Sequence, residues 1–126
     1  MPPTVLVVDD TPSIRFLIRT NLELAGFEVT EASDGQDCLD ILAAAETLPD
    51  VVTMDMVMPR MDGVTAITRI RANPDYAGIG LVMVSTQSQQ IDMNRAAAAG
   101  VDEYVIKPFD PDVLVEAVRR VHESRR

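Results

Sequence analysis

Short apolar runs alternate with helix-forming segments along the chain, and this alternation restricts the fold more than any other feature of the sequence. The expected strands are residues 5–8, 27–31, 51–54, 81–84 and 104–106. After each run, apolar residues recur at the three- and four-residue spacing of a helix that buries one side. Strands and helices that alternate in this way predict a parallel sheet with helices on both faces.

The helix boundaries are predicted from residues that begin or stop helices. The N-caps expected before four helices are Thr11, Asp34, Asp62 and Asp110. The remaining helix, the fourth, is expected to begin at about Ser88. The expected stops are Gly26, Pro49-Asp50, Asn73-Pro74 and Gly100. The expected buried side of the first helix is Ile14, Leu17, Ile18 and Leu22, and that of the last is Leu114, Ala117, Val118 and Val121.

Five strand–helix units in 126 residues fit one domain that spans residues 1–126. Right-handed crossovers leave few ways to wind the sheet, and the order expected for five strands is 2-1-3-4-5. The predicted class is therefore α/β, a flavodoxin-like (βα)5 sandwich of three layers. Residues 27–31 alternate apolar and polar side chains, which predicts a half-exposed strand near an edge of the sheet.

Charge and hydropathy exclude several classes of partner. The formal net charge of −9 disfavours binding to nucleic acid, because basic residues must neutralise its phosphates. No apolar run approaches the roughly 18 residues that predict a membrane helix, and the start of the chain lacks the basic residues of a secretory signal. We therefore expect a cytoplasmic protein without direct contact with nucleic acid or membrane. Cys38 is expected to be a small buried helix residue.

Polar residues stand at the carboxyl ends of four of the five expected strands. Asp9-Asp10 follow the first, Asp55 the third, Ser85 the fourth and Lys107 the fifth. Ligands bind at this edge of an open parallel sheet. The fold therefore predicts that three carboxylates, a hydroxyl and an ammonium share a small volume.

Crowded carboxylates repel one another, so this cluster requires cations. Lys107 supplies one positive charge, and all-oxygen ligands suit Mg²⁺ or Mn²⁺. A carboxylate beside such an ion and a lysine suits phosphoryl transfer, with the carboxylate as nucleophile. Asp55 is the predicted nucleophile, because it stands alone at the switch point of the sheet.

The sequence closely resembles the receiver domains of bacterial two-component response regulators, and the resemblance covers essentially its whole length. The motifs that carry the resemblance are VVDD at residues 7–10, MDMVMPRMDG at 54–63, VST at 84–86 and KPF at 107–109. Together they are highly specific. The single-domain form resembles chemotaxis-type or phosphorelay regulators.

The resemblance implies a role for each residue. Asp55 accepts phosphate from a histidine kinase or phosphotransfer protein, and the chain catalyses only its own phosphorylation and dephosphorylation. The implied Mg²⁺ ligands are Asp10, Asp55 and the backbone carbonyl of Val57, with Asp9 acting mainly through bound water. Ser85 and Lys107 hold the phosphoryl group, and the bond to Pro108 is cis. Tyr104 occupies the position of a switch aromatic.

The same resemblance implies how the signal leaves the domain. Phosphorylation is expected to draw Ser85 towards the phosphate and let Tyr104 rotate inward, which reshapes the face made by the fourth helix, fifth strand and fifth helix. A downstream protein is expected to bind this face. The chain is expected to be a monomer or a weak, phosphorylation-dependent dimer.

Some positions depart from the commonest pattern of the family. Thr86 is bulkier than the usual alanine and is expected to narrow access to the site. Val57 and Gln87 occupy positions that tune the lifetime of the phosphoryl group. Valine cannot orient an attacking water, so slow self-hydrolysis is expected.

Three other functions are rivals to this interpretation. A receiver-like module that binds partners without phosphorylation is the main alternative, and Thr86 leaves room for it. A phosphatase of the haloacid dehalogenase type has Asp-x-Asp after its first strand, whereas this chain has Asp9-Asp10-Thr11. A flavodoxin requires a phosphate-cradling loop there, and Asp9-Asp10 would repel that phosphate.

Overall fold

The computed structural model describes residues 2–125. Its five strands form one parallel sheet in the order β2-β1-β3-β4-β5, which confirms the predicted α/β fold and strand order. The strands are β1 (Thr4–Val8), β2 (Glu28–Ala32), β3 (Val51–Met54), β4 (Gly80–Ser85) and β5 (Glu103–Ile106). The helices are α1 (Pro12–Leu24), α2 (Gly35–Ala44), α3 (Gly63–Ala72), α4 (Gln90–Ala99) and α5 (Pro111–Ser124), with a 3-10 turn η1 (Pro74–Tyr76).

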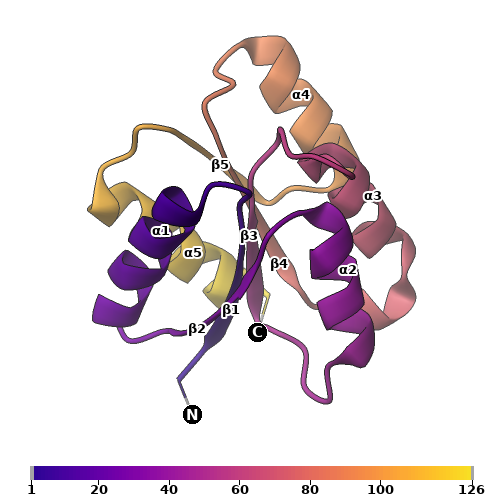
Figure 1. Ribbon diagram of the computed structural model, residues 1–126, viewed down its shortest axis with the longest axis horizontal. Coiled ribbons are helices and arrows are strands. Elements are labelled where there is room, and N and C mark those ends of the chain that lie inside the picture. The colour runs from indigo at the N-terminus through magenta and orange to yellow at the C-terminus, as the bar shows by residue number, and fades with distance from the viewer. Residues whose placement is uncertain (1, 126) are drawn as a thin grey trace.

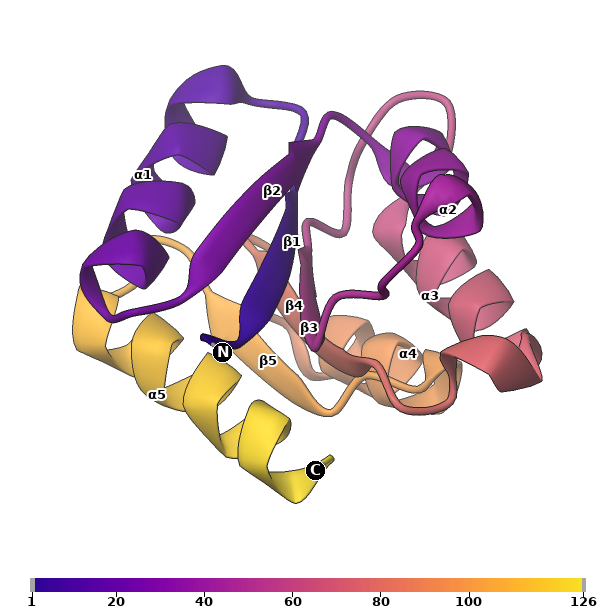
Figure 2. The ribbon, with the colours of Figure 1, turned by 90° about the horizontal axis from the view of Figure 1, so that it is seen from below.

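The sheet is the middle of three layers (Figures 1 and 2). Helices α1 and α5 cover one face, and α2, α3 and α4 cover the other. The sheet separates two apolar cores, because alternate residues of each strand point to opposite faces. Leu6, Val52 and Met54 belong to the core beneath α2 and α3, whereas Val5 and Val51 belong to the core beneath α1 and α5.

The position of each strand in the sheet explains its burial. The central strands β3 and β4 are buried at every residue, as is typical of strands covered on both faces. Strand β2 lies at the edge and is half-exposed, as predicted, with Val29 and Ala32 as its buried residues. On α5, the predicted apolar side is confirmed, since Leu114, Ala117, Val118 and Val121 are buried.

Three of the four predicted N-caps are confirmed. The side chains of Asp34, Asp62 and Asp110 each accept a hydrogen bond from a backbone N–H in the first turn of their helix. Thr11 occupies the N-cap position of α1, but its side chain makes no capping hydrogen bond. Instead, its backbone N–H donates to Asp9 Oδ1 at 2.9 Å, so the loop before α1 is tied to an acid at the end of β1.

Several predicted details were wrong. Leu17 is exposed, because α1 meets the sheet through Ile18 and Leu22. Helix α2 ends at Ala44, before the predicted stop at Pro49-Asp50, and α4 begins at Gln90, where Gln89 and Asp92 form a capping box.

Cys38 is buried, as expected. Among residues 2–125, no helix combines the length and hydropathy that crossing a membrane requires.

Candidate functional site

The carboxyl ends of the four strands β1, β3, β4 and β5 meet at one edge of the sheet, which we call the rim. Parallel pairing brings this about, since Val8 lies beside Met54 and Ser85 beside Ile106. Asp9-Asp10, Asp55 and Lys107 follow directly after β1, β3 and β5, and Ser85 is the last residue of β4. The structure therefore brings the predicted site residues of all four strands to one edge.

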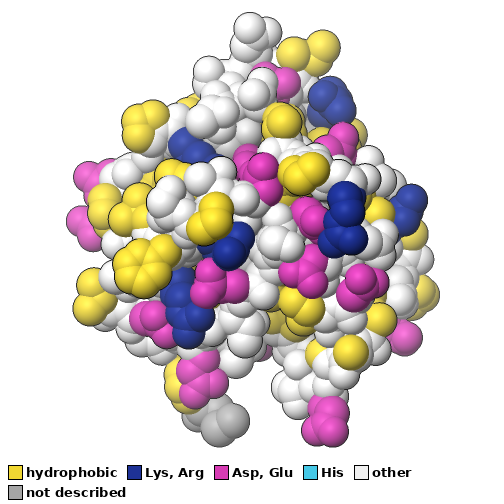
Figure 3. Space-filling view, in the orientation of Figure 1, with side chains coloured by type: hydrophobic (Ala, Val, Ile, Leu, Met, Phe, Trp, Pro, Cys, Tyr) yellow, Lys and Arg dark blue, Asp and Glu magenta, His cyan; other side chains and the backbone are white. Residues whose placement is uncertain are grey.

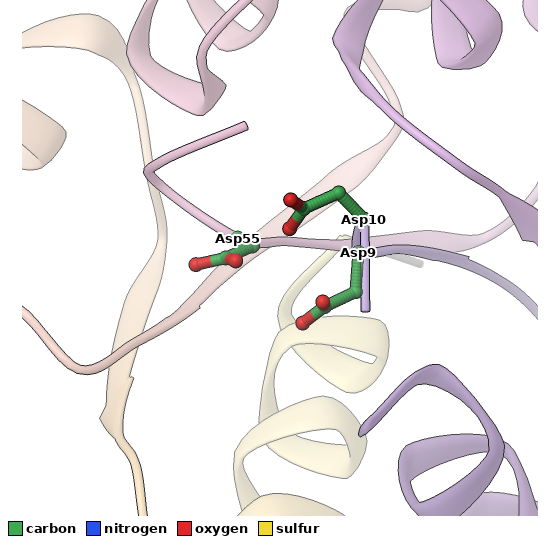
Figure 4. Close-up of side chains that lie close together, drawn as sticks. All are labelled: Asp9, Asp10 and Asp55. Atoms are coloured by element: carbon green, nitrogen blue, oxygen red, sulfur yellow. The ribbon is translucent and has the colours of Figure 1, made fainter. Parts of the chain in front are cut away.

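Three carboxylates converge at the rim (Figure 4). Asp9, Asp10 and Asp55 each offer an oxygen, and these oxygens all lie within 4.8 Å of one another. Asp9 is 1% exposed, Asp55 is half-buried and Asp10 is exposed. One buried and two more accessible carboxylates thus face a common space.

Lys107 is the cation nearest to these acids. Its Nζ lies 2.7 Å from Asp9 Oδ2 and 3.5 Å from Asp55 Oδ2, and its side chain is 11% exposed. The ammonium therefore bridges the ends of β1 and β3 from the end of β5. The Lys107–Pro108 peptide bond is cis.

The electrostatics of the rim favour a bound cation. Burial raises the pKa of the Asp55 carboxyl, and the negative charges of Asp9 and Asp10 raise it further. The Lys107 ammonium and a hydrogen bond from the Met56 backbone lower the same pKa without cancelling the rise. A divalent cation would relieve this repulsion, and three carboxylates are the hard oxygen donors that Mg²⁺ prefers. The donor set therefore fits the expected ion.

Further contacts fix the carboxylate-bearing end of β1. Arg15 on α1 donates from Nη1 to the backbone carbonyl of Asp9 at 2.8 Å, and from Nε to Glu31 of β2 at 2.9 Å. Together with the Thr11 N–H, this arginine holds the backbone and the side chain of Asp9. The role of Arg15 was missed, because nothing in its sequence context indicates a contact with a backbone carbonyl.

Ser85 and Tyr104 are linked through the loop that follows β4. Ser85 is fully buried, and its Oγ accepts a hydrogen bond from the Gln87 N–H at 3.1 Å. The Tyr104 hydroxyl donates to the carbonyl of the same Gln87. The two residues expected to switch thus bond the N–H and the carbonyl of the same residue, Gln87, and the neighbouring Thr86 is exposed.

An open pocket of about 630 Å³ lies beside Asp55. Asp10, Asp55 and Lys107 supply its charged groups, and Thr11, Thr86 and Gln87 supply further polar lining. Its apolar lining comes from Ile14, Leu17, Val57, Pro108 and Phe109. Phe16 and Leu17 of α1 are also exposed, and Figure 3 shows hydrophobic side chains gathered over α1 and the segment leading into α5. A partner that reaches Asp55 would therefore meet an apolar surface around the acids.

The loop between β3 and α3, residues 55–62, contains a contact that the sequence did not reveal. Arg60 forms an ion pair with Asp34, the N-cap of α2, at 2.8 Å and 3.0 Å. Asp34 was predicted as a helix cap, but its arginine partner lies 26 residues away in sequence. No local pattern predicts such a pairing.

A family model, a curated relative and a solved structure each match this chain over most of its length. A family model described as the response regulator receiver domain matches residues 5–119. The chain is 36% identical over 122 residues to the chemotaxis protein CheY of Thermotoga maritima, covering 96% of this chain and 98% of that protein. A crystal structure of a putative response regulator from Chloroflexus aurantiacus superposes with a TM-score of 0.92 and 30% identity, covering 98% of this chain and 99% of that one.

Longer relatives match through one part only. The chain is 34% identical to the DNA-binding dual master transcriptional regulator RpaA of a Synechocystis strain over 93% of its own length, but covers 48% of that protein. It spans about half the length of the transcriptional regulators that it matches.

Proposed function

Because the chain belongs to the response regulator receiver domain family, we propose that it is a phosphorylation-controlled switch whose phosphoacceptor is Asp55. One observation carries the proposal: Asp55 shares its space with two further carboxylates, within 4.8 Å, and with the Lys107 ammonium at 3.5 Å. An ordinary aspartate in a turn has no reason to lie beside two further carboxylates and a lysine. Such a grouping suits a carboxylate that reacts with a phosphoryl group.

The transfer follows from this arrangement. A carboxylate oxygen of Asp55 attacks the phosphorus of a phosphohistidine, the new O–P bond forms, and the N–P bond breaks with its electron pair returning to the imidazole. Lys107 neutralises a phosphoryl oxygen, and Ser85 donates its hydroxyl to another. Asp10, Asp55 and the Val57 carbonyl would hold Mg²⁺, with Asp9 helping through water, and the ion would supply positive charge to the phosphoryl oxygens.

The proposed donor is a histidine kinase or a phosphotransfer protein, acting in the cytoplasm. The open pocket beside Asp55 supports this, because a protein donor must bring its histidine within bonding distance of the carboxylate. The apolar lining from α1 and the Pro108-Phe109 segment offers that donor a contact surface. We propose that the chain catalyses no reaction other than its own phosphorylation and dephosphorylation.

Incubation with Mg²⁺ and acetyl phosphate, followed by intact mass measurement, tests the proposal. We expect the mass of one phosphoryl group in the wild type, and none in Asp55→Ala or without Mg²⁺. Absence of the gain, or its persistence in Asp55→Ala, would favour a module that binds partners without phosphorylation. Release of phosphate from generic esters would instead indicate a phosphatase.

The proposed output is a changed surface on α4, β5 and α5. Each of these elements exposes one large apolar side chain, Ile91, Ile106 and Val113 respectively, which suits a protein-binding face. Tyr104 joins β5 to the loop before α4, so movement of that loop on phosphorylation would reach this face. The relatives that it matches include a chemotaxis protein and longer transcriptional regulators, which supports a role in two-component signal transduction.

Amide chemical shifts locate the response. With Mg²⁺ and acetyl phosphate, we expect the largest changes away from the site to fall in α4, β5 and the start of α5. Asp55→Ala should show none of them. Changes confined to the rim would contradict the proposed output face.

Val57 provides a prediction about the lifetime of the phosphorylated state. Its side chain is 61% exposed and borders the pocket, but it has no polar atom that could orient a water molecule. Val57→Asn should therefore shorten the half-life of the phosphorylated chain, by roughly a factor of ten. Decay followed by intact mass after removal of acetyl phosphate checks this, and equal half-lives would contradict it.

A further inference from the structure

Val57 carries a backbone carbonyl assigned to the metal, yet its own side chain is largely exposed, so the position of that carbonyl depends on the rest of the loop. We propose that Arg60 is a positioning residue, whose ion pair with Asp34 fixes the loop of residues 55–62 and thereby sets the affinity of the rim for Mg²⁺. The inference rests on the proposed function, because it assumes that the rim binds this ion.

The ion pair is a two-point contact between an exposed arginine, whose side chain is 59% exposed, and a buried carboxylate. Arg60 Nε lies 2.8 Å from Asp34 Oδ2, and Arg60 Nη2 lies 3.0 Å from Asp34 Oδ1, so both carboxylate oxygens are engaged. The Asp34 side chain is 8% exposed and also accepts a hydrogen bond from the Asp37 N–H at 2.8 Å. A planar guanidinium bound in this two-point manner is fixed in direction as well as distance.

The backbone of Arg60 adopts an unusual conformation, which gives the ion pair a structural role. Arg60 has a φ of 65°, and it is the only residue other than glycine with a positive φ among those the structure describes. L-amino acids with long side chains rarely adopt this left-handed conformation. The Met61 N–H donates to the Pro59 carbonyl at 2.7 Å and closes a tight turn around Arg60. The ion pair therefore holds a turn that the backbone alone disfavours.

The turn is coupled to Val57 through buried neighbours. Met56 and Met58 flank Val57, and with Met61 they are buried in the core beneath α2 and α3. The Gly63 N–H donates to the Met56 carbonyl at 2.8 Å across the base of the loop. Val57 and the turn at Arg60 therefore belong to one segment, whose buried residues Met56, Met58 and Met61 pack in the same core.

A second contact joins this loop to α2. A Cβ atom placed on Gly35, the first residue of α2, would lie only 2.8 Å from the Met61 carbonyl oxygen. The start of α2 thus touches the loop at Met61 through Gly35 and at Arg60 through Asp34. Helix α2 is therefore the support against which the loop is held.

Substitutions at Arg60 distinguish the effect of losing the guanidinium from the effect of changing the backbone conformation. Arg60→Gly and Arg60→Asn both tolerate a positive φ but lack the guanidinium. Arg60→Lys keeps a positive charge without the two-point contact. Arg119→Asn is the matched control, because Arg119 is an exposed arginine on α5, paired with Glu116 of the same helix. The measurement is a titration of the unphosphorylated chain with MgCl₂, followed by amide chemical shifts, together with urea unfolding in Mg²⁺-free buffer.

We expect the Mg²⁺ dissociation constant to rise roughly tenfold in Arg60→Gly and Arg60→Asn, less in Arg60→Lys, and not at all in Arg119→Asn. The urea curves should show all variants folded under the titration conditions. Wild-type affinity in both Arg60→Gly and Arg60→Asn would overturn the positioning role while leaving the proposed function intact. Failure of the wild type itself to bind Mg²⁺ would overturn both.

Discussion

Asp34 serves with one carboxylate as the N-cap of α2 and as the partner of Arg60. The hydrogen bond from Arg60 holds the pKa of the Asp34 carboxyl below its ordinary value, and the Asp37 backbone N–H acts in the same direction against the effect of burial. A carboxyl whose pKa is lowered on folding contributes stability above its unfolded pKa, about 3.9, and loses it as the pH falls through the folded value.

The pH dependence of Arg60→Asn tests this linkage. At pH 7 the variant should be less stable than the wild type, because the ionised Asp34 loses its partner. The difference should shrink below about pH 4, as Asp34 becomes protonated in both proteins. Urea unfolding between pH 7 and pH 3 measures it, and a difference independent of pH would assign the loss to the turn rather than to the ion pair.

The stability contribution of Asp55 depends on pH in the opposite sense to that of Asp34. Folding raises the pKa of Asp55, and burial is the largest cause. Such a group contributes stability below its unfolded pKa and loses it as the pH rises through the folded value. In Mg²⁺-free buffer, Asp55→Asn should therefore be more stable than the wild type at pH 7, by roughly 1 kcal/mol, with the advantage shrinking towards pH 4. Glu46→Gln, which removes an exposed charge, is the control. A less stable Asp55→Asn at pH 7 would contradict the prediction.

At the scale of elements, α3 begins against the acceptor strand. A Cβ atom on Gly63, the first residue of α3, would lie 2.2 Å from the Asp55 carbonyl oxygen. Gly63→Ala must therefore move the helix start away from β3, which should cost roughly 1–3 kcal/mol of stability and slow phosphorylation of Asp55. Gly78→Ala is the control, because a Cβ there meets nothing within 4 Å. Urea unfolding and intact mass after acetyl phosphate measure both effects, and a Gly63→Ala chain that matches Gly78→Ala would refute the contact.

The same scale shows what sequence patterns predict well. All five strands were identified, because four are runs of apolar residues between turn or cap signals and the fifth, β2, follows an alternating pattern. Errors arose where packing decides the outcome. Leu17 has helical spacing equal to that of Ile18, but only the tilt of α1 on the sheet determines which of them is buried. The 3-10 turn at Pro74–Tyr76 was not predicted, because Asn73-Pro74 indicates only that α3 ends.

At the scale of the whole molecule, the rim was predictable because the topology alone brings the strand ends together. The strand order alone was enough to predict where the acids and the lysine lie. Two supporting contacts, from Arg15 to the Asp9 carbonyl and from Arg60 to Asp34, join residues of different loops and elements. Their geometry depends on backbone turns such as the left-handed Arg60, which no periodicity encodes.

Metal binding should change the stability of the molecule as a whole. An ion that binds the folded rim, and not the unfolded chain, raises the unfolding free energy by RT ln(1 + [L]/Kd). We expect MgCl₂ at about ten times its dissociation constant to stabilise the wild type by roughly 1.4 kcal/mol, and Asp10→Asn by less. Thermal unfolding with matched NaCl controls for ionic strength. Equal Mg²⁺ responses in the two proteins would remove Asp10 from the ligand set.

The two described ends of the chain lie at the edge of the sheet where the strands begin, opposite the rim (Figure 1). The Thr4 N–H bonds Asp50 Oδ2 just before β3, and Arg125 donates to the Ala77 carbonyl just before β4. A tether, dye or fused protein added at either end would hang from the side remote from the reacting carboxylate. The chain can therefore be immobilised or joined to reporters without screening Asp55 from an incoming phosphohistidine.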